Sequence, residues 1–268
     1  MLDQQKIKVV FFDAGGTLFR PYPSVGDVYA RTAARHGVIV QAHEVEEAFH
    51  TSWHKRNGMV SLAGRTTEKI ERDWWYALVR DVFGNLDAFK DFDGFFEELY
   101  DLFARAECWR LFDDTVPTLD RLKAEGYRLG IISNWDHRLF SIVEQLGLSH
   151  YFEHVTASSK VGTAKPGAAI FHHALKALKI PVEAAVHVGD SLADDYHGAT
   201  AVGMKAVLLD RHRKEYNGVV SVTSLDDIIP LLNSSPAERG RGGPEGGEGT
   251  SRDLPPHLPS PPKGARNF

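Results

Sequence analysis

The chain has a single cysteine, Cys108, among its 268 residues. One cysteine cannot form an internal disulfide, so a disulfide-stapled scaffold is excluded and a reducing, cytoplasmic location is the expectation. No apolar stretch approaches the roughly 18 residues that a membrane-spanning helix needs. Positive charge is not in excess either, because 31 Lys and Arg stand against 36 Asp and Glu. With no Lys/Arg cluster present, this balance argues against a nucleic-acid partner.

The first residues run almost directly into an apolar strand at 7–12, so we expect no signal peptide. From Asp113 to Leu232, short apolar runs alternate with helical segments. This alternation predicts an α/β fold, a doubly wound parallel sheet with a Rossmann-like core of about five or six strands. The later strands are expected at 128–132, 154–157, 184–188 and 205–209, with helices at 137–146, 168–178 and 195–202.

Residues 20–110 separate the first strand from the rest and have a helical pattern. One stripe at three- and four-residue steps marks a helix face that packs into a core; it consists of Phe92, Phe95, Phe96, Leu99, Tyr100 and Phe103. We therefore predict a helical cap over 20–110, inserted into a core made of 1–19 and 111–233. Residues 234–268 contain 14 Pro and Gly in 35 positions, which predicts a disordered tail.

Chemistry-bearing residues follow these strands at their ends. Asp13 comes directly after the first apolar run, Ser133 and Asn134 follow the second strand, and Asp190 follows the strand at 184–188. Ligands bind beyond the carboxyl ends of strands in open parallel sheets. We therefore expect Asp13, Ser133 and Asp190 to form one site. Lys165, in a loop before Pro166, is expected to supply the positive charge of this site.

These four motifs, in this order, resemble those of the haloacid dehalogenase superfamily of aspartate-nucleophile hydrolases, in particular the haloacid dehalogenase-like hydrolase domain-containing group. The resemblance covers Ile7 to about Leu232. It implies a phosphatase in which Asp13 attacks phosphorus and forms an aspartyl-phosphate that water cleaves. Lys165 would be the second catalytic residue. It would also bind the phosphate of a small phosphorylated substrate, together with Ser133 and Asn134.

The resemblance also implies a Mg²⁺ ion bound by Asp13, the carbonyl oxygen of Gly15, and Asp190. Such hard oxygen donors are what Mg²⁺ prefers. By spacing, Asp195 matches the further metal-binding acid better than Asp194, which stays the alternative. We expect Asp194 to do no more than N-cap the helix that follows.

One position departs from the phosphatase pattern, because Gly15 stands where most relatives have a second Asp that acts as general acid and base. Such catalysis contributes typically about 10²–10⁴-fold in rate. Three readings stay open: a slow or specialised Mg²⁺-dependent phosphatase, a non-enzymatic phosphate- or partner-binding protein, and a metal-independent dehalogenase. A phosphonatase would need a cap lysine such as Lys55. Restoring the acid by Gly15→Asp should raise hydrolysis of alkyl phosphates.

Substrate choice should lie with the cap, where His54, Lys55, Arg56 and Arg65 face either the site or solvent. His187 lies within a predicted strand and is expected to be a core histidine. The sequence does not fix the oligomeric state.

Overall fold

The computed structural model describes residues 7–62, 65–212 and 216–233. The predicted tail at 234–268 lies outside the described residues. The centre of the fold is a six-stranded sheet in the order β5-β4-β1-β6-β7-β8, with every neighbouring pair parallel. This confirms the predicted α/β sheet. Its strands are β1 (Val9–Phe12), β4 (Arg128–Ser133), β5 (His154–Ala157), β6 (Ala185–Gly189), β7 (Lys205–Leu209) and β8 (Ser221–Val222).

The central strand β1 lies between β4 and β6. Its last residue, Phe12, pairs with Ile131 on one side and Val188 on the other. After β1 the chain builds β4 and β5 on one side and then β6 to β8 on the other. The topological switch point, where open α/β sheets bind ligands, therefore lies between β1 and β6.

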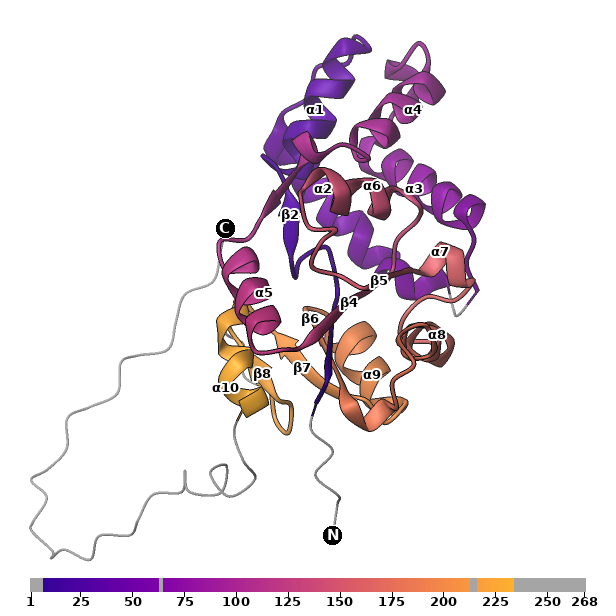
Figure 1. Cartoon of the computed structure of the whole chain (residues 1–268). Helices are drawn as coiled ribbons and strands as arrows, with labels where there is room; N and C mark the ends of the chain where they lie inside the picture. The colour runs from indigo at the N-terminus through magenta and orange to yellow at the C-terminus, as the bar shows by residue number, and fades with distance from the viewer. Residues whose placement is uncertain (1–6, 63–64, 213–215, 234–268) are drawn as a thin grey trace, which may run out of the picture. The chain divides into compact units, whose positions relative to one another are not determined.

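Helices cover both faces of the sheet (Figure 1). Val10 and Phe12 pack in one hydrophobic cluster with α5 (Thr115–Ala124), α6 (Arg138–Gln145) and α10 (Ile228–Asn233). Val9 and Phe11 pack on the opposite face with α8 (Ala168–Leu178) and α9 (Gly198–Ala201). All four β1 side chains are buried because successive residues of a strand point to opposite faces. Each contributes about 1.5–3 kcal/mol by leaving water.

The helical insert enters and leaves through a two-stranded antiparallel ribbon of β2 (Phe19–Pro21) and β3 (Trp109–Leu111). We call residues 20–110 the cap. The cap has its own hydrophobic cluster, in which the predicted stripe on α4 buries Phe95, Phe96, Leu99 and Tyr100. Its α-helices are α1 (Val25–Arg35), α2 (Ala42–Lys55), α3 (Glu68–Phe83) and α4 (Phe92–Leu102).

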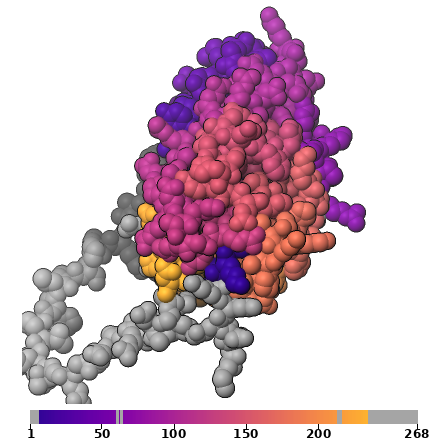
Figure 2. All heavy atoms as spheres, in the orientation of Figure 1, coloured from indigo at the N-terminus to yellow at the C-terminus, as the bar shows by residue number. Residues whose placement is uncertain are grey.

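In the space-filling view, the segment that follows the cap, coloured magenta to salmon, covers the middle of the visible face (Figure 2). It includes the loops and helices that lead from β3 to β5. Every helix of the described residues is too short or too polar to cross a membrane.

Candidate active site

The site centres on Asp13, which follows β1 at the carboxyl edge of the sheet and is almost fully buried. Its Oδ1 accepts hydrogen bonds from Ser133 Oγ at 2.8 Å and from Lys165 Nζ at 2.5 Å. These donors come from the end of β4 and from the loop before α8. Parallel register explains the meeting of Asp13 and Ser133, because β1 and β4 end side by side.

Lys165 is the charged centre of this cluster, with only 2% of its surface exposed. Its ammonium group contacts Asp13 Oδ1, Asp195 Oδ1 at 2.6 Å and the carbonyl oxygen of Ile132 at 2.9 Å. Burial opposes the charged form of Lys165, but attraction to Asp13 and Asp195 outweighs it and holds its pKa above the usual value. Lys165 is therefore a fixed positive charge at neutral pH. Its charge also holds the pKa of Asp195 below its usual value against the effect of burial.

Asn134 fixes the backbone on which Lys165 is carried. Its Oδ1 accepts from the Lys165 backbone N–H at 2.6 Å, and its Nδ2 donates to the Lys165 carbonyl at 3.0 Å. The amide thus orients the lysine loop. Direct contact of Asn134 with substrate stays a prediction.

Three carboxylates meet beside Lys165. Oxygen atoms of Asp13, Asp190 and Asp195 lie within 4.8 Å of one another. Gly16 permits this approach, because a Cβ there would lie 2.4 Å from Asp190 Oδ2 and because its φ of +83° favours glycine.

Although Asp190 faces open space, the surrounding protein desolvates its carboxyl group, and Asp13 and Asp195 repel its charge. Together they raise its pKa to about 8. A hard divalent cation fits this donor set, since it would offset that repulsion. Gly15 as a carbonyl ligand stays a prediction.

The two acids after Asp190 have different environments. Asp195 belongs to the carboxylate cluster, whereas Asp194 does not. The expectation that Asp194 caps the following helix is wrong, because the N-cap is Ser191, whose hydroxyl accepts from the Asp194 N–H at 3.1 Å. Asp194 Oδ1 is buried without a hydrogen-bond partner, and burial raises the pKa of this group to about 6.

His187 is a core residue of β6, as expected, but it also touches the site. Its Nε2 lies 2.8 Å from Asp195 Oδ1, and its Nδ1 is buried without a partner. Burial lowers the pKa of His187, so the neutral ring with its proton on Nε2 fits these contacts. In the sequence, the only indication of this contact is that His187 stands two residues before Gly189, so that both residues lie on the same face of the strand.

A cavity of about 830 Å³ opens from these carboxylates into the cap. Of the four cap side chains considered from sequence, His54 lines the cavity, whereas Lys55, Arg56 and Arg65 do not. Arg56 instead pairs with Asp81. The position of Lys55 removes the support for a phosphonatase reading, because the lysine that such an enzyme needs must reach the substrate.

The ring of Trp135 fills the space that a side chain at residue 15 would occupy, where most phosphatases of the family are expected to have an acid. A Cβ on Gly15 would lie 2.9 Å from Cζ3 and 3.4 Å from Cη2 of Trp135. The Trp135 ring packs edge-on against Phe19, and its centroid lies 5.1 Å from that of Trp109. Its backbone N–H donates to Ser158 Oγ at 2.9 Å. The sequence analysis did not anticipate this role, because nothing local to Trp135 shows what it faces.

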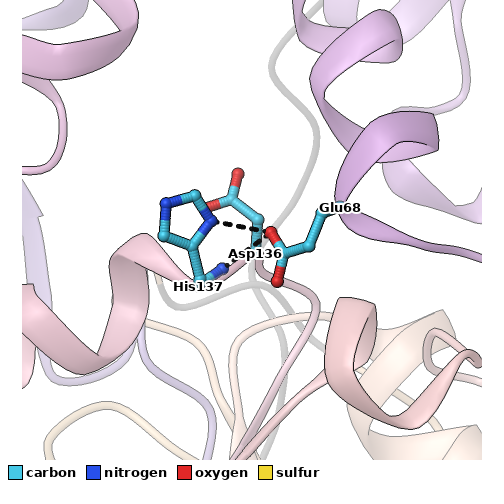
Figure 3. A group of neighbouring side chains, drawn as sticks. All are labelled: Glu68, Asp136 and His137. Carbon is cyan, nitrogen blue, oxygen red and sulfur yellow. Dashed lines mark hydrogen bonds and ion pairs between the residues drawn. The ribbon is translucent and has the colours of Figure 1, made fainter.

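Two glutamates of α3 connect the cap to the core. Glu68 Oε2 accepts from the backbone N–H of His137 and contacts its ring Nδ1 at 2.8 Å (Figure 3). Its other oxygen accepts from Ser159 at 2.8 Å and pairs with Lys160. The fully buried Glu71 accepts at Oε1 from Thr66 at 2.8 Å and from Ser158 at 2.6 Å.

Asp136, also drawn in Figure 3, lies just before α6. The N-cap of α6 is His137, and Asp136 Oδ1 accepts from the Arg138 N–H. The main partners of Asp136 are the Arg138 guanidinium and the Tyr100 hydroxyl. This buried charge pair joins α4 of the cap to the start of α6.

The fold and the site together define a class of proteins that have an aspartate, a lysine and further carboxylates at the switch point of a parallel α/β sheet. Residues 7–203 match the family model described as haloacid dehalogenase-like hydrolase. The chain belongs to the haloacid dehalogenase-like hydrolase family.

Two relatives and one solved structure illustrate the range of similar proteins. Haloacid dehalogenase-like hydrolase domain-containing protein 3 of Danio rerio is 33% identical over 207 residues, covering 76% of this chain and 86% of that protein. Glyceraldehyde 3-phosphate phosphatase of Methanothermobacter thermautotrophicus is 38% identical over 135 residues, or 46% of this chain and 57% of that protein. The crystal structure of a phosphatase of the family from Thermococcus onnurineus has a TM-score of 0.62 at 26% identity, covering 85% of this chain and 98% of that one.

Proposed function

We propose that the chain is a Mg²⁺-dependent phosphoric monoester hydrolase that forms an aspartyl-phosphate on Asp13. The observation that carries this proposal is the environment of Asp13, whose carboxylate is held beside a lysine, a serine and two further carboxylates. Both phosphatases among the comparisons support the same reaction class.

Each side chain has a definite task in this reaction. Ser133 and Lys165 hold Oδ1 of Asp13, so we assign Oδ2 as the oxygen that attacks phosphorus. The buried ammonium group of Lys165 stabilises negative charge on the transferring phosphoryl group, because a fixed charge in a water-poor site needs no reorganisation during the reaction. Asp13, Asp190 and Asp195 would hold Mg²⁺, which would supply charge compensation for the phosphate.

The same geometry argues against a metal-independent dehalogenase. Asp190 adds a carboxylate that is repelled by its acidic neighbours, and a bound cation would offset this repulsion. In a reaction without metal that carboxylate would have no task.

The test is hydrolysis of p-nitrophenyl phosphate, an ester with a good leaving group. We expect release of p-nitrophenol with Mg²⁺, none with EDTA, and background release by Asp13→Asn. The matched control is Asp87→Asn, which alters an exposed cap carboxylate outside the cavity.

Two results would contradict the proposal. Absence of Asp13-dependent release from any ester would favour a non-catalytic binding protein. Fluoride release from fluoroacetate in the presence of EDTA would favour dehalogenation.

A further inference from the structure

The wall of the cavity above the carboxylates is largely aromatic. Six of its rings are Phe49, Trp53, Trp75, Phe96, Tyr100 and Trp109. Several already pack in pairs, as Phe49 and Trp53 do with an interplanar angle of 27°. Aromatic walls of this kind favour flat ring systems, which stack against them or meet their edges. At about 830 Å³ the cavity is at the large end for small-molecule sites.

Much of the hydrogen-bonding capacity in this part of the cavity is used within the protein. The Arg138 guanidinium and the Tyr100 hydroxyl both donate to Asp136. Glu46 accepts from the Gly26 N–H. Of the other polar cap side chains along the wall, His50 and His54 are exposed. Arg138, Tyr100 and Glu46 therefore offer little to pair with the hydroxyl groups of a sugar, which lose hydrogen bonds to water when they bind.

Trp135 adds an independent constraint on the leaving group. Its ring lies 2.9 Å from where a Cβ of residue 15 would stand, and Phe19 and Trp109 hold it there. An acidic side chain at position 15 could not donate a proton while the ring is in this place. Residue 15 therefore supplies no proton to the leaving oxygen. This favours a leaving group that is stable as an anion.

We propose, resting on the proposed function, that the substrate is an aryl phosphate: a phosphate monoester of a phenolic hydroxyl on a flat, extended ring system. Asp13 Oδ2 bonds to phosphorus as the bond from phosphorus to the phenolic oxygen breaks. The electron pair stays on that oxygen, which departs as phenolate and takes its proton from water. A water molecule then attacks phosphorus, the bond to Asp13 breaks, and inorganic phosphate and the free carboxylate result. The ring system binds among the aromatic side chains of the cap.

The first experiment compares esters with Mg²⁺ present. Phenyl phosphate and cyclohexyl phosphate have rings of similar size but leaving groups of very different acidity. We expect kcat/KM to be at least about 10²-fold higher for phenyl phosphate, the lower range of a general acid's contribution. Phenol and 2-naphthol have similar acidity, so an expected KM about 10-fold lower for 2-naphthyl phosphate reports on the cavity wall. A 5′-nucleoside monophosphate, which pairs a flat base with an alkyl leaving group, should be a poor substrate.

The second experiment separates binding from chemistry by using phosphonates, which lack the scissile P–O bond. Naphthalene-2-phosphonate should inhibit at least about 10-fold more strongly than methylphosphonate, measured in the presence of Mg²⁺. Trp53→Leu should remove most of that difference, whereas Phe140→Leu, which changes an exposed aromatic residue of α6 outside the cavity, should retain it. A thermal melt of each variant checks that it is folded, and Trp75→Leu replaces Trp53→Leu if it is not.

The outcomes distinguish this proposal from the one on which it rests. Asp13-dependent hydrolysis with equal rates for the phenyl and cyclohexyl esters, with preference for the nucleotide, or with phosphonate inhibition insensitive to the ring, would overturn the aryl proposal alone. No hydrolysis of any ester would overturn both.

Discussion

At the scale of single residues, the contact between Gly15 and Trp135 determines how the missing acid can be restored. Gly15 has an ordinary φ, so a side chain there is blocked by Trp135 and not by backbone strain. The sequence-based expectation that Gly15→Asp would by itself raise hydrolysis of alkyl phosphates must therefore be revised.

We now expect Gly15→Asp alone to give no gain on alkyl phosphates. The double variant Gly15→Asp/Trp135→Ala should raise kcat/KM on cyclohexyl phosphate by up to about 10²-fold, because the new carboxyl group has room to reach the leaving oxygen. Steady-state kinetics on all variants measures this, with Trp135→Ala as the control. An equal gain from Gly15→Asp alone would show that the Trp135 ring moves aside readily.

His187 is the second residue-scale test, because it holds Asp195 from inside the sheet. His187→Leu removes the donor to Asp195, and the apparent affinity for Mg²⁺ should weaken about 10- to 100-fold, the usual effect of losing a partner of a metal ligand. His187→Gln keeps an N–H donor and should recover part of the loss.

The Mg²⁺ concentration that gives half-maximal activity is the quantity to measure for these variants. The control is His172→Leu, which changes an exposed histidine of α8. If His187→Leu lowers thermal stability but leaves the Mg²⁺ dependence unchanged, His187 has a packing role only.

At the scale of elements, Glu71 ties α3 to Ser158, the first residue of the short helix α7 (Ser158–Val161), and makes the cap sensitive to pH. Burial, in spite of hydrogen bonds from Ser158 and Thr66, raises the pKa of Glu71 to about 7. Between pH 4.5 and 7 the unfolded chain releases this proton while the folded chain keeps it. Glu71 therefore lowers the free energy of unfolding as pH rises through this window.

We expect Glu71→Gln to remove that pH dependence, because the amide is neutral at every pH. The variant should match the parent near pH 4.5 and exceed it at pH 8, by at most about 3 kcal/mol. Urea unfolding at both pH values measures the difference. Glu47→Gln, an exposed change on α2, should show no such effect. A variant less stable than the parent at pH 8 would mean that the fold stabilises the ionised carboxylate, so that the pKa of Glu71 is not raised.

The elements also show what the sequence could predict. β1, β4, β5, β6 and β7 each carry four or more residues, at least half of them apolar or glycine, and were found. β2, β3 and β8 have two or three residues each, too few for a period-2 pattern, and were missed. Asp13, Ser133 and Asp190 could be grouped because parallel strands end together. The contact of Trp135 with Gly15 could not, because nothing in the sequence around Trp135 shows which residue its ring faces. The contact of Asp136 with Tyr100 could not either, because it depends on how the cap packs on the core.

At the scale of the whole molecule, ligand binding at the sheet edge should stabilise the entire fold, because Asp13, Lys165 and Asp190 come from segments that meet only in the folded chain. Mg²⁺ with beryllofluoride, a mimic of a phosphoryl group on a carboxylate, should raise the melting temperature. At 100 times the dissociation constant the gain is about 2.7 kcal/mol, which corresponds to about 5–10 °C for a fold of this size.

Differential scanning calorimetry of the parent and of Asp13→Asn measures this gain. The variant should gain little, because the mimic needs the carboxylate oxygen. A shift of the same size in both proteins would place the bound anion away from Asp13.

The antiparallel ribbon of β2 and β3 has a consequence for the history of such a chain. Both crossings between the sheet and the insert run next to each other, with Arg20 opposite Arg110. An insert at this ribbon needs only two attachment points, which lie next to each other at the strand spacing of about 4.8 Å. Helical inserts of other lengths and shapes could be exchanged there without reordering the sheet, so new leaving groups could be acquired while the phosphate chemistry stays in place.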